Sequence, residues 1–238
     1  MIITQNLSPN RNLGRNNWIP DIIVCHITDG SFDGAVSWIK NPASNVSYHF
    51  VVARDGRLTQ MVNISDTAFA NGTTNLVNDS RFNGNSNLKA VRERRVNANL
   101  YTISIGFEGR FTETAGALTD FQIVCGVWLI DFIREYVFDN YGVEIRADRE
   151  HIVGHSDIVP RWKPNCPGEA FPFDLILRGV NGGDAAHQNG PLSGRPPAWA
   201  NASWGWATRL GITDGSSPNA NPTRAQVVQM LYNFHNAR

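Results

Sequence analysis

The sequence predicts an α/β domain with a mixed central β-sheet flanked by helices, followed by a small C-terminal helical module. Strand patterns alternate with helical patterns over residues 20–175, which is typical of an α/β domain. Residues 180–197 are small, polar and proline-containing, as expected of a linker. We therefore expect a folded domain over 1–179, a linker over 180–197 and helices over 198–238.

Composition narrows the class of protein. The 238 residues are 42% hydrophobic and 18% charged, enough for one substantial core and a small appendage. The formal net charge is zero, so no overall field attracts nucleic acid or an anionic membrane. No apolar run reaches membrane-spanning length, and the N-terminus lacks a signal-peptide pattern. We expect synthesis in the cytoplasm, without membrane insertion or a nucleic-acid partner.

The first elements are a buried strand and a short helix. Residues 22–27 form an apolar, β-branched run that ends in a polar histidine, His26, and an isoleucine. Apolar residues then recur at helical spacing over about 33–40, until Asn41-Pro42 stops the pattern. The strand is expected to carry His26 on one face and Cys25 on the other.

A hairpin and an irregular segment come next. Residues 48–53 and 58–62 read as two strands around an Asp-Gly turn at 55–56. Residues 71–99 are rich in Asn, Arg, Ser and Gly and show little periodicity. This excursion is longer than a connection needs, so it is either functional or a surface loop.

The second half begins with a strand and a long helix. Residues 101–108 alternate as a strand that ends in Glu108. Thr119 and Gln122 form a capping box, and the helix that they open ends near residues 141–142. Its apolar stripe is expected to consist of Phe121, Val124, Cys125, Trp128, Leu129, Phe132 and Tyr136.

Ligand chemistry points to a zinc site. His155 and Cys166 lie in one short segment and supply two residue types that Zn²⁺ prefers. A catalytic zinc site needs a third protein ligand, and His26 at the end of a rigid strand is the best candidate. The odd count of three cysteines argues against a disulfide framework, and we expect Cys25 and Cys125 to be buried thiols.

Four motifs in order carry a family resemblance. They are the strand that ends in His26, residues 48–50 before the Asp-Gly turn, residues 104–108, and residues 154–157 leading to Cys166-Pro167-Gly168. Together they resemble the zinc-dependent type 2 N-acetylmuramoyl-L-alanine amidases, a superfamily that includes phage endolysins and peptidoglycan recognition proteins. The resemblance implies that fold, and it implies that His26, His155 and Cys166 hold zinc.

The implied reaction is hydrolysis of the peptidoglycan amide between N-acetylmuramic acid and L-alanine. The resemblance offers two candidates for the base, Glu108 and Tyr48. We favour Glu108, because a carboxylate needs a smaller pKa shift than a phenol to act near neutrality; Tyr48 would orient water or substrate. Lys163 is the candidate for stabilising the oxyanion. One residue more than usual separates Lys163 from Cys166, so Arg161 is the substitute.

Two further histidines, His49 and His151, are expected to be structural. The C-terminal helices resemble a single S-layer homology repeat, most closely at residues 223–226. This implies binding to a secondary cell-wall polymer or, for a repeat this short, docking or homo-oligomerisation.

The sequence therefore predicts a phage-type endolysin, or a related autolysin, that acts at a Gram-positive cell wall. Two alternatives stay open. One is a cytosolic muropeptide-recycling amidase, and the other is a peptidoglycan-binding protein without catalysis.

Overall fold

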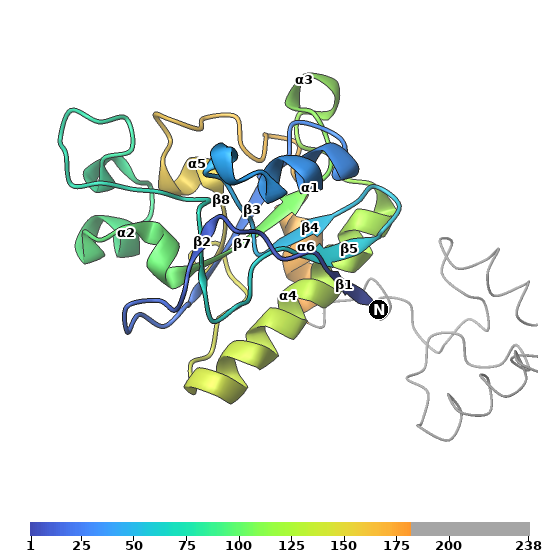
Figure 1. Ribbon diagram of the computed structural model, residues 1–238, viewed down its shortest axis with the longest axis horizontal. Coiled ribbons are helices and arrows are strands. Elements are labelled where there is room, and N and C mark those ends of the chain that lie inside the picture. The colour runs from blue at the N-terminus through green and yellow to red at the C-terminus, as the bar shows by residue number, and fades with distance from the viewer. Residues whose placement is uncertain (182–238) are drawn as a thin grey trace, which may run out of the picture. The chain divides into compact units, whose positions relative to one another are not determined.

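A six-stranded mixed β-sheet lies at the centre of the part of the chain that the structure, a computed structural model, describes, residues 1–181 (Figure 1). The strand order is β1 (Ile3–Gln5), β5 (Leu58–Gln60), β4 (Phe50–Val52), β7 (Thr102–Phe107), β3 (Ile22–Ile27) and β8 (Ile152–Gly154). β4, β7, β3 and β8 are parallel neighbours, whereas β5 is antiparallel to β4. The expected mixed α/β fold is confirmed. The module over 198–238 and nearly all of the linker lie outside the described residues.

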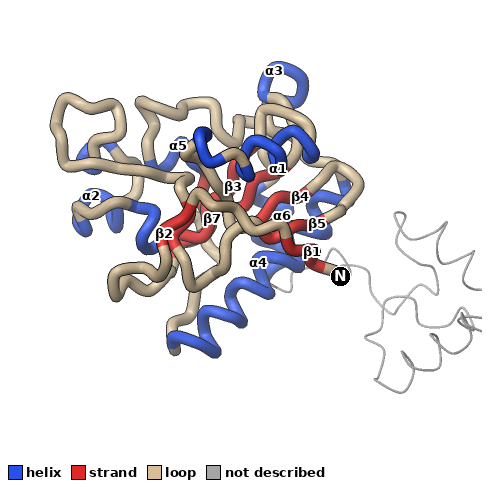
Figure 2. Tube along the Cα trace, in the orientation of Figure 1, coloured by secondary structure: helices blue, strands red, loops and turns tan. Residues whose placement is uncertain are grey.

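Helices cover both faces of this sheet (Figures 1 and 2). Their bounds are α1 (Phe32–Lys40), α2 (Lys89–Arg94), α3 (Phe111–Thr114), α4 (Asp120–Tyr141), α5 (His155–Ile158) and α6 (Phe173–Val180), with 3-10 turns at Pro42–Ser44, Asn83–Asn85 and Ala98–Tyr101. α4 and α6 pack on one face in the largest apolar cluster. α1, α2 and α5 pack on the other face in two smaller clusters. A two-stranded ribbon, β2 (Arg11–Asn12) with β6 (Thr67–Ala68), lies outside the main sheet.

The predicted strands and hairpin are present. β3 spans the expected residues 22–27, and β7 is slightly shorter than expected. β4 and β5 form the expected antiparallel hairpin, with Gly56 at a positive φ of 84° in the turn. β3 alternates as expected: Cys25 is buried in the α4 cluster, and His26 faces the side of α1 and α5.

The long helix α4 begins and ends as predicted, but its buried stripe differs. Thr119 and Gln122 form the capping box, and Gly142 ends the helix in the left-handed conformation. The predicted stripe was wrong at Phe121 and Val124, whose exposed fractions are 63% and 41%. The buried residues are Gln122, Cys125, Gly126, Leu129, Ile130, Ile133 and Val137. The helix is apolar around most of its circumference, so periodicity could not fix which side faces the sheet.

The segment 71–99 is largely irregular, as expected, but it is anchored. It contains α2, whose Val91 is fully buried against β3 in the cluster with Ile22 and Val24. Ser86 Oγ donates a hydrogen bond to the carbonyl of Asp157 in α5 at 2.9 Å. The excursion therefore packs on the sheet face that carries His26.

Arg15 ties the N-terminal segment to the core. Its buried guanidinium donates to the backbone carbonyls of Ile64, Asn99, Leu100 and Thr102 at 2.7–3.3 Å. Burial lowers the pKa of Arg15 to about 10. The side chain thus satisfies four carbonyls around the start of β7.

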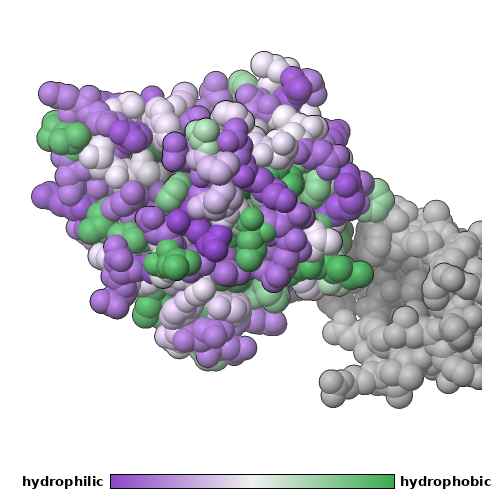
Figure 3. All heavy atoms as spheres, in the orientation of Figure 1, coloured by the Kyte–Doolittle hydropathy of each residue, from purple (hydrophilic) through white to green (hydrophobic). Residues whose placement is uncertain are grey.

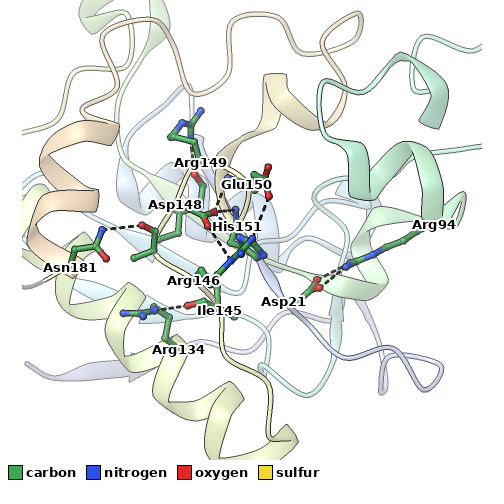
Figure 4. Close-up of polar contacts among 12 residues, drawn as sticks. Asp21, Arg94, Arg134, Ile145, Arg146, Asp148, Arg149, Glu150, His151 and Asn181 are labelled. Carbon is green, nitrogen blue, oxygen red and sulfur yellow. Dashed lines mark hydrogen bonds and ion pairs between the residues drawn. The ribbon is translucent and has the colours of Figure 1, made fainter.

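The loop between α4 and β8 is held by side chains that Figure 4 shows together. Arg134 donates to the carbonyl of Ile145 at 2.7 Å, and Asn181 donates to that of Ala147 at 3.0 Å. His151 Nδ1 lies 2.6 Å from a carboxylate oxygen of Asp148. This contact holds the His151 side chain within the loop, consistent with a structural role.

The surface in Figure 3 is mostly hydrophilic, with separate apolar patches. Among residues 1–181, no helix has both the length and the apolar character needed to cross a membrane.

Candidate metal centre and active site

Parallel strand pairing brings two histidines together at one edge of the sheet. β3 and β8 run side by side with Cys25 opposite Gly154, so His26 and His155 follow as neighbours. Their ring centroids lie 4.5 Å apart. Both rings are buried, with exposed fractions of 0% and 4%.

Cys166 completes the group from a loop after α5. Its Sγ lies 3.8 Å from Nδ1 of His26, and the ligand atoms of His26, His155 and Cys166 all lie within 4.8 Å of one another. The loop is held by the amide of Ser156, which donates to the carbonyl of Cys166 at 2.7 Å. Zinc ligands at about 2.0–2.3 Å in a tetrahedron are roughly 3.3–3.8 Å apart. A small contraction would therefore let the three residues hold a metal ion.

Burial sets the protonation of this group. Burial is the main reason that the pKa of His26 lies well below its ordinary range and that the pKa of His155 falls to about 3. The nearby Lys163 cation lowers both pKa values further. Burial also raises the pKa of Cys166 to about 11. A hydrogen bond from the backbone N–H of Ile27 acts in the opposite direction and lowers this pKa. Both imidazoles are neutral near pH 7, as metal ligands must be.

Asn71 lies behind His26 as a second layer. Its amide nitrogen donates to Oγ1 of Thr102 at 3.0 Å and to Oγ of Ser104 at 2.8 Å, which fixes the side chain. Asn71 is a polar neighbour of the His26 ring, and its side chain opposes the fall in the His26 pKa. Within residues 1–181, His26 Nε2 and Asn71 Oδ1 both lack a partner at normal hydrogen-bond distance. The two atoms are complementary, because a protonated Nε2 donates and an amide oxygen accepts.

A cavity of about 600 Å³ opens beside the three candidate ligands. Its charged and aromatic lining residues are Asp29, Tyr48, Phe69, Arg81, Phe111, Trp162 and Lys163. His155 and Cys166 contribute to the same wall. The cavity is large enough for a substrate segment of drug-like size.

Tyr48 lies in this cavity against the candidate metal ligands. Its ring centroid is 4.8 Å from that of His26. Burial raises the pKa of Tyr48 well above its ordinary range, so the phenol keeps its proton. Gly106 makes room for the ring, because a Cβ at this position would lie 2.6 Å from Tyr48 Cδ2.

The two candidates for the oxyanion group are placed differently. Lys163 lines the cavity, with Nζ 4.9 Å from the centroid of the Trp162 ring. Arg161 is exposed and does not line the cavity. Pro164 and Asn165, the residues between Lys163 and Cys166, also lie in the lining. The extra residue therefore leaves Lys163 directed to the cavity.

Glu108 does not line the cavity. One of its carboxylate oxygens, Oε2, accepts a hydrogen bond from the backbone amide of Arg54 at 2.8 Å. Strand alternation nevertheless places residue 108 on the same face of β7 as Gly106, the residue opposite His26.

His49 is buried away from the cavity. Its Nδ1 accepts a hydrogen bond from the amide of Ser104 at 3.0 Å, and its Nε2 lies 2.8 Å from Nη2 of Arg15. These contacts place His49 among the polar groups of the core, in keeping with the expected structural part.

Sequence reasoning missed three residues of this site: Asn71, Arg81 and Trp162. Asn71 and Arg81 belong to the excursion, whose length was the only signal available. Trp162 lies beside Lys163, and its ring is 5.8 Å from that of His155. Long-range packing brings these three residues to the site, and no local pattern marks them.

The sequence pattern of the Amidase_2 family, described as N-acetylmuramoyl-L-alanine amidase, matches residues 15–169. The chain belongs to this family. The match covers the strands and loops that carry His26, Tyr48, His155 and Cys166. Membership in this amidase family makes peptidoglycan the substrate class.

Individual relatives of this amidase are distant. N-acetylmuramoyl-L-alanine amidase A of Achromobacter lyticus is 23% identical over 171 residues, which cover 68% of this chain and 83% of the relative. The 1,6-anhydro-N-acetylmuramyl-L-alanine amidase AmpD of Haemophilus influenzae is 29% identical over 135 residues, which cover 57% and 59%. A mutant structure of PlyL has a TM-score of 0.52 at 16% identity, covers 76% and 99%, and shows the fold alone.

Proposed function

We propose that this amidase is a zinc-dependent hydrolase that cleaves the bond between N-acetylmuramic acid and L-alanine in peptidoglycan. The observation that carries the proposal is the convergence of His26, His155 and Cys166 within 4.8 Å at the wall of the cavity. Two neutral imidazoles and one cysteine sulfur, which would give up its proton on binding the metal, match the donor set that zinc prefers. Zinc held by these residues supplies Lewis acidity toward a carbonyl oxygen and activates a water molecule.

The protein's own side chains divide the remaining work. Lys163 carries a positive charge into the cavity and stabilises the negative charge that develops on the carbonyl oxygen. Tyr48 keeps its proton and donates a hydrogen bond that orients water or the substrate carbonyl.

Glu108 is proposed as the base that takes the proton from water. To reach the cavity, its carboxylate has to leave the Arg54 amide and rotate along the face of β7 that it shares with Gly106. Catalytic hydrogen bonds often reach their final geometry only when the substrate binds.

The cellular task that we propose is that of a phage-type endolysin, or a related autolysin, at a Gram-positive wall. In this proposal residues 1–179 are the catalytic domain, 180–197 the linker, and 198–238 a module that binds a secondary wall polymer or forms homo-oligomers. A muropeptide-recycling amidase is the second candidate, since the relative from Haemophilus influenzae is named for an anhydro-muropeptide substrate.

The first experiment combines zinc content with product analysis. Full-length protein is expected to contain about one zinc per chain and to release peptides with N-terminal alanine from purified walls. Cys166→Ala should lose both properties. Cys125→Ala is the matched control, because Cys125 is a fully buried thiol in α4 packed on the opposite face of the sheet. Release of alanine peptides by zinc-free protein would contradict zinc dependence, and no release by zinc-loaded protein would contradict catalysis.

A second experiment separates the cellular tasks. An endolysin should cleave intact walls faster than soluble anhydro-muropeptides, and deletion of residues 198–238 should reduce its pelleting with walls. Preference for the soluble fragments, with pelleting unchanged by the deletion, would favour the recycling enzyme.

A further inference from the structure

Arg81 is the residue of the 71–99 excursion that brings positive charge to the cavity. It lines the cavity together with Lys163, and its side chain is 44% exposed. The mechanism proposed above gives Arg81 no task. It is nevertheless hydrogen-bonded on one side by Asp79.

Asp79 brackets Arg81 through three hydrogen bonds. Oδ1 of Asp79 accepts the backbone amide of Arg81 at 2.8 Å and its Nε at 3.0 Å, and Oδ2 accepts Nη2 at 2.7 Å. These bonds lower the pKa of Asp79 to about 2, so the carboxylate stays charged. Within residues 1–181, no hydrogen bond or ion pair engages Nη1 of Arg81. One edge of the guanidinium is therefore fixed, and Nη1 remains able to donate to a ligand.

Trp162 links Arg81 to the candidate metal site. The Arg81 guanidinium lies 5.7 Å from the centroid of the Trp162 ring, and that ring lies 5.8 Å from the ring of His155. Lys163 Nζ lies 4.9 Å from the same tryptophan ring. The Arg81 and Lys163 cations thus both lie near the Trp162 ring, which in turn lies next to the candidate zinc ligand His155.

The charge of the cavity is unevenly distributed. Asp29 is its one acidic lining residue among those described, and its Oδ1 accepts a hydrogen bond from the amide of Phe111 at 3.2 Å. Arg81 and Lys163 come from other segments, next to Trp162. An acidic group on the substrate would be attracted to the side of Trp162.

We propose that Arg81 binds a carboxylate of the stem peptide and so selects acidic stem peptides over their amidated forms. This inference rests on the proposed function. An extended peptide advances about 3.3–3.6 Å per residue, so a carboxylate two or three residues beyond the scissile bond lies roughly 7–11 Å from it. The two contacts through Trp162, of 5.7 and 5.8 Å, together reach at most a comparable length. An arginine fixed along one edge is well suited to recognising a carboxylate.

The test compares two synthetic muramoyl peptides that differ only at the second residue, with a free α-carboxyl in one and a carboxamide in the other. The wild-type protein should hydrolyse the acidic peptide with the higher kcat/KM. Arg81→Gln should lower kcat/KM for the acidic peptide about 10- to 100-fold, mainly through KM, and change hydrolysis of the amide little. Asp79→Ala should shift the same ratio in the same direction by a smaller factor, since Asp79 positions Arg81.

Arg57→Gln is the matched control. Arg57 is bracketed by Asp55 through the same backbone and Nε contacts, at 3.0 and 2.8 Å, but it does not line the cavity. Its substitution should leave the ratio of kcat/KM between the two peptides unchanged.

Equal losses on the two peptides in Arg81→Gln, or no loss, would overturn the assignment of Arg81 while leaving the amidase proposal standing. If the wild-type protein cleaves neither these peptides nor purified walls, the proposed function itself fails.

Discussion

Removing the Asn71 side chain tests whether a second layer orients the candidate metal ligand His26. Asn71→Ala deletes the amide oxygen that complements His26 Nε2, while the other ring nitrogen, Nδ1, lies 3.8 Å from Cys166 Sγ. Partners of this kind fix the tautomer and the ring orientation of a metal-binding histidine. We therefore expect a loss of metal affinity in addition to a loss of stability.

The size of each effect follows from the contacts. Asn71 donates two buried hydrogen bonds, to Thr102 and Ser104, and each is worth about 1 kcal/mol, so unfolding of the metal-free variant should require about 2 kcal/mol less. Loss of a second-layer partner weakens metal binding by about 10- to 100-fold. This corresponds to about 1.4–2.8 kcal/mol of binding free energy.

The two effects are measured separately, by urea unfolding in the presence of a chelator and by zinc competition against a chromophoric chelator. Asn83→Ala provides the control. Asn83 is also buried and donates one side-chain hydrogen bond to Asn75 at 3.0 Å, and its Oδ1 has no partner among residues 1–181, but it does not line the cavity. If Asn71→Ala binds zinc as tightly as Asn83→Ala does, the reasoning about His26 is refuted.

Three further perturbations test other parts of the structure. Arg15→Met should lower the free energy of unfolding by about 3–5 kcal/mol, because four buried carbonyls lose their donor; a loss below 1 kcal/mol in urea melts would contradict this. The Asp79–Arg81 contact has a depressed carboxyl pKa, so its stabilisation is complete above the ordinary value of 3.8 and is lost as pH falls toward 2. An NMR titration should place the Asp79 midpoint near 2, rising toward 3.8 in Arg81→Gln. Glu108→Gln should lower kcat by about 10²- to 10⁴-fold and Tyr48→Phe by less; the reverse order would move the base to Tyr48.

Local patterns predicted the elements whose signals are strong and short-ranged. The β-branched run at 22–27, the Asp-Gly turn and the Thr119 capping box each specify their own backbone, and all three are present. β8 is only three residues long, so it carries too little periodicity to detect. The buried side of α4 was misassigned for a related reason, since an apolar surface on most sides contains no local information about which side meets the sheet.

Sequence chemistry also named candidate ligands that lie close together in the fold. Donor preference singled out His26, His155 and Cys166, and their side chains meet in space. The positions of Lys163 and Glu108 relative to the cavity depend on loop paths and side-chain rotation, which no motif encodes. Arg81 depends on how a long excursion folds back across the sheet, and residue spacing cannot predict that.

The separation of His26 from Cys166 along the chain has a consequence during synthesis. The two residues are 140 positions apart, although their side chains lie 3.8 Å apart in the fold. At about 5–20 residues per second, a ribosome needs on the order of ten seconds to travel from one to the other. Throughout that interval the nascent chain exposes one half of the site without the other, so the centre can form only after nearly the whole domain has left the ribosome.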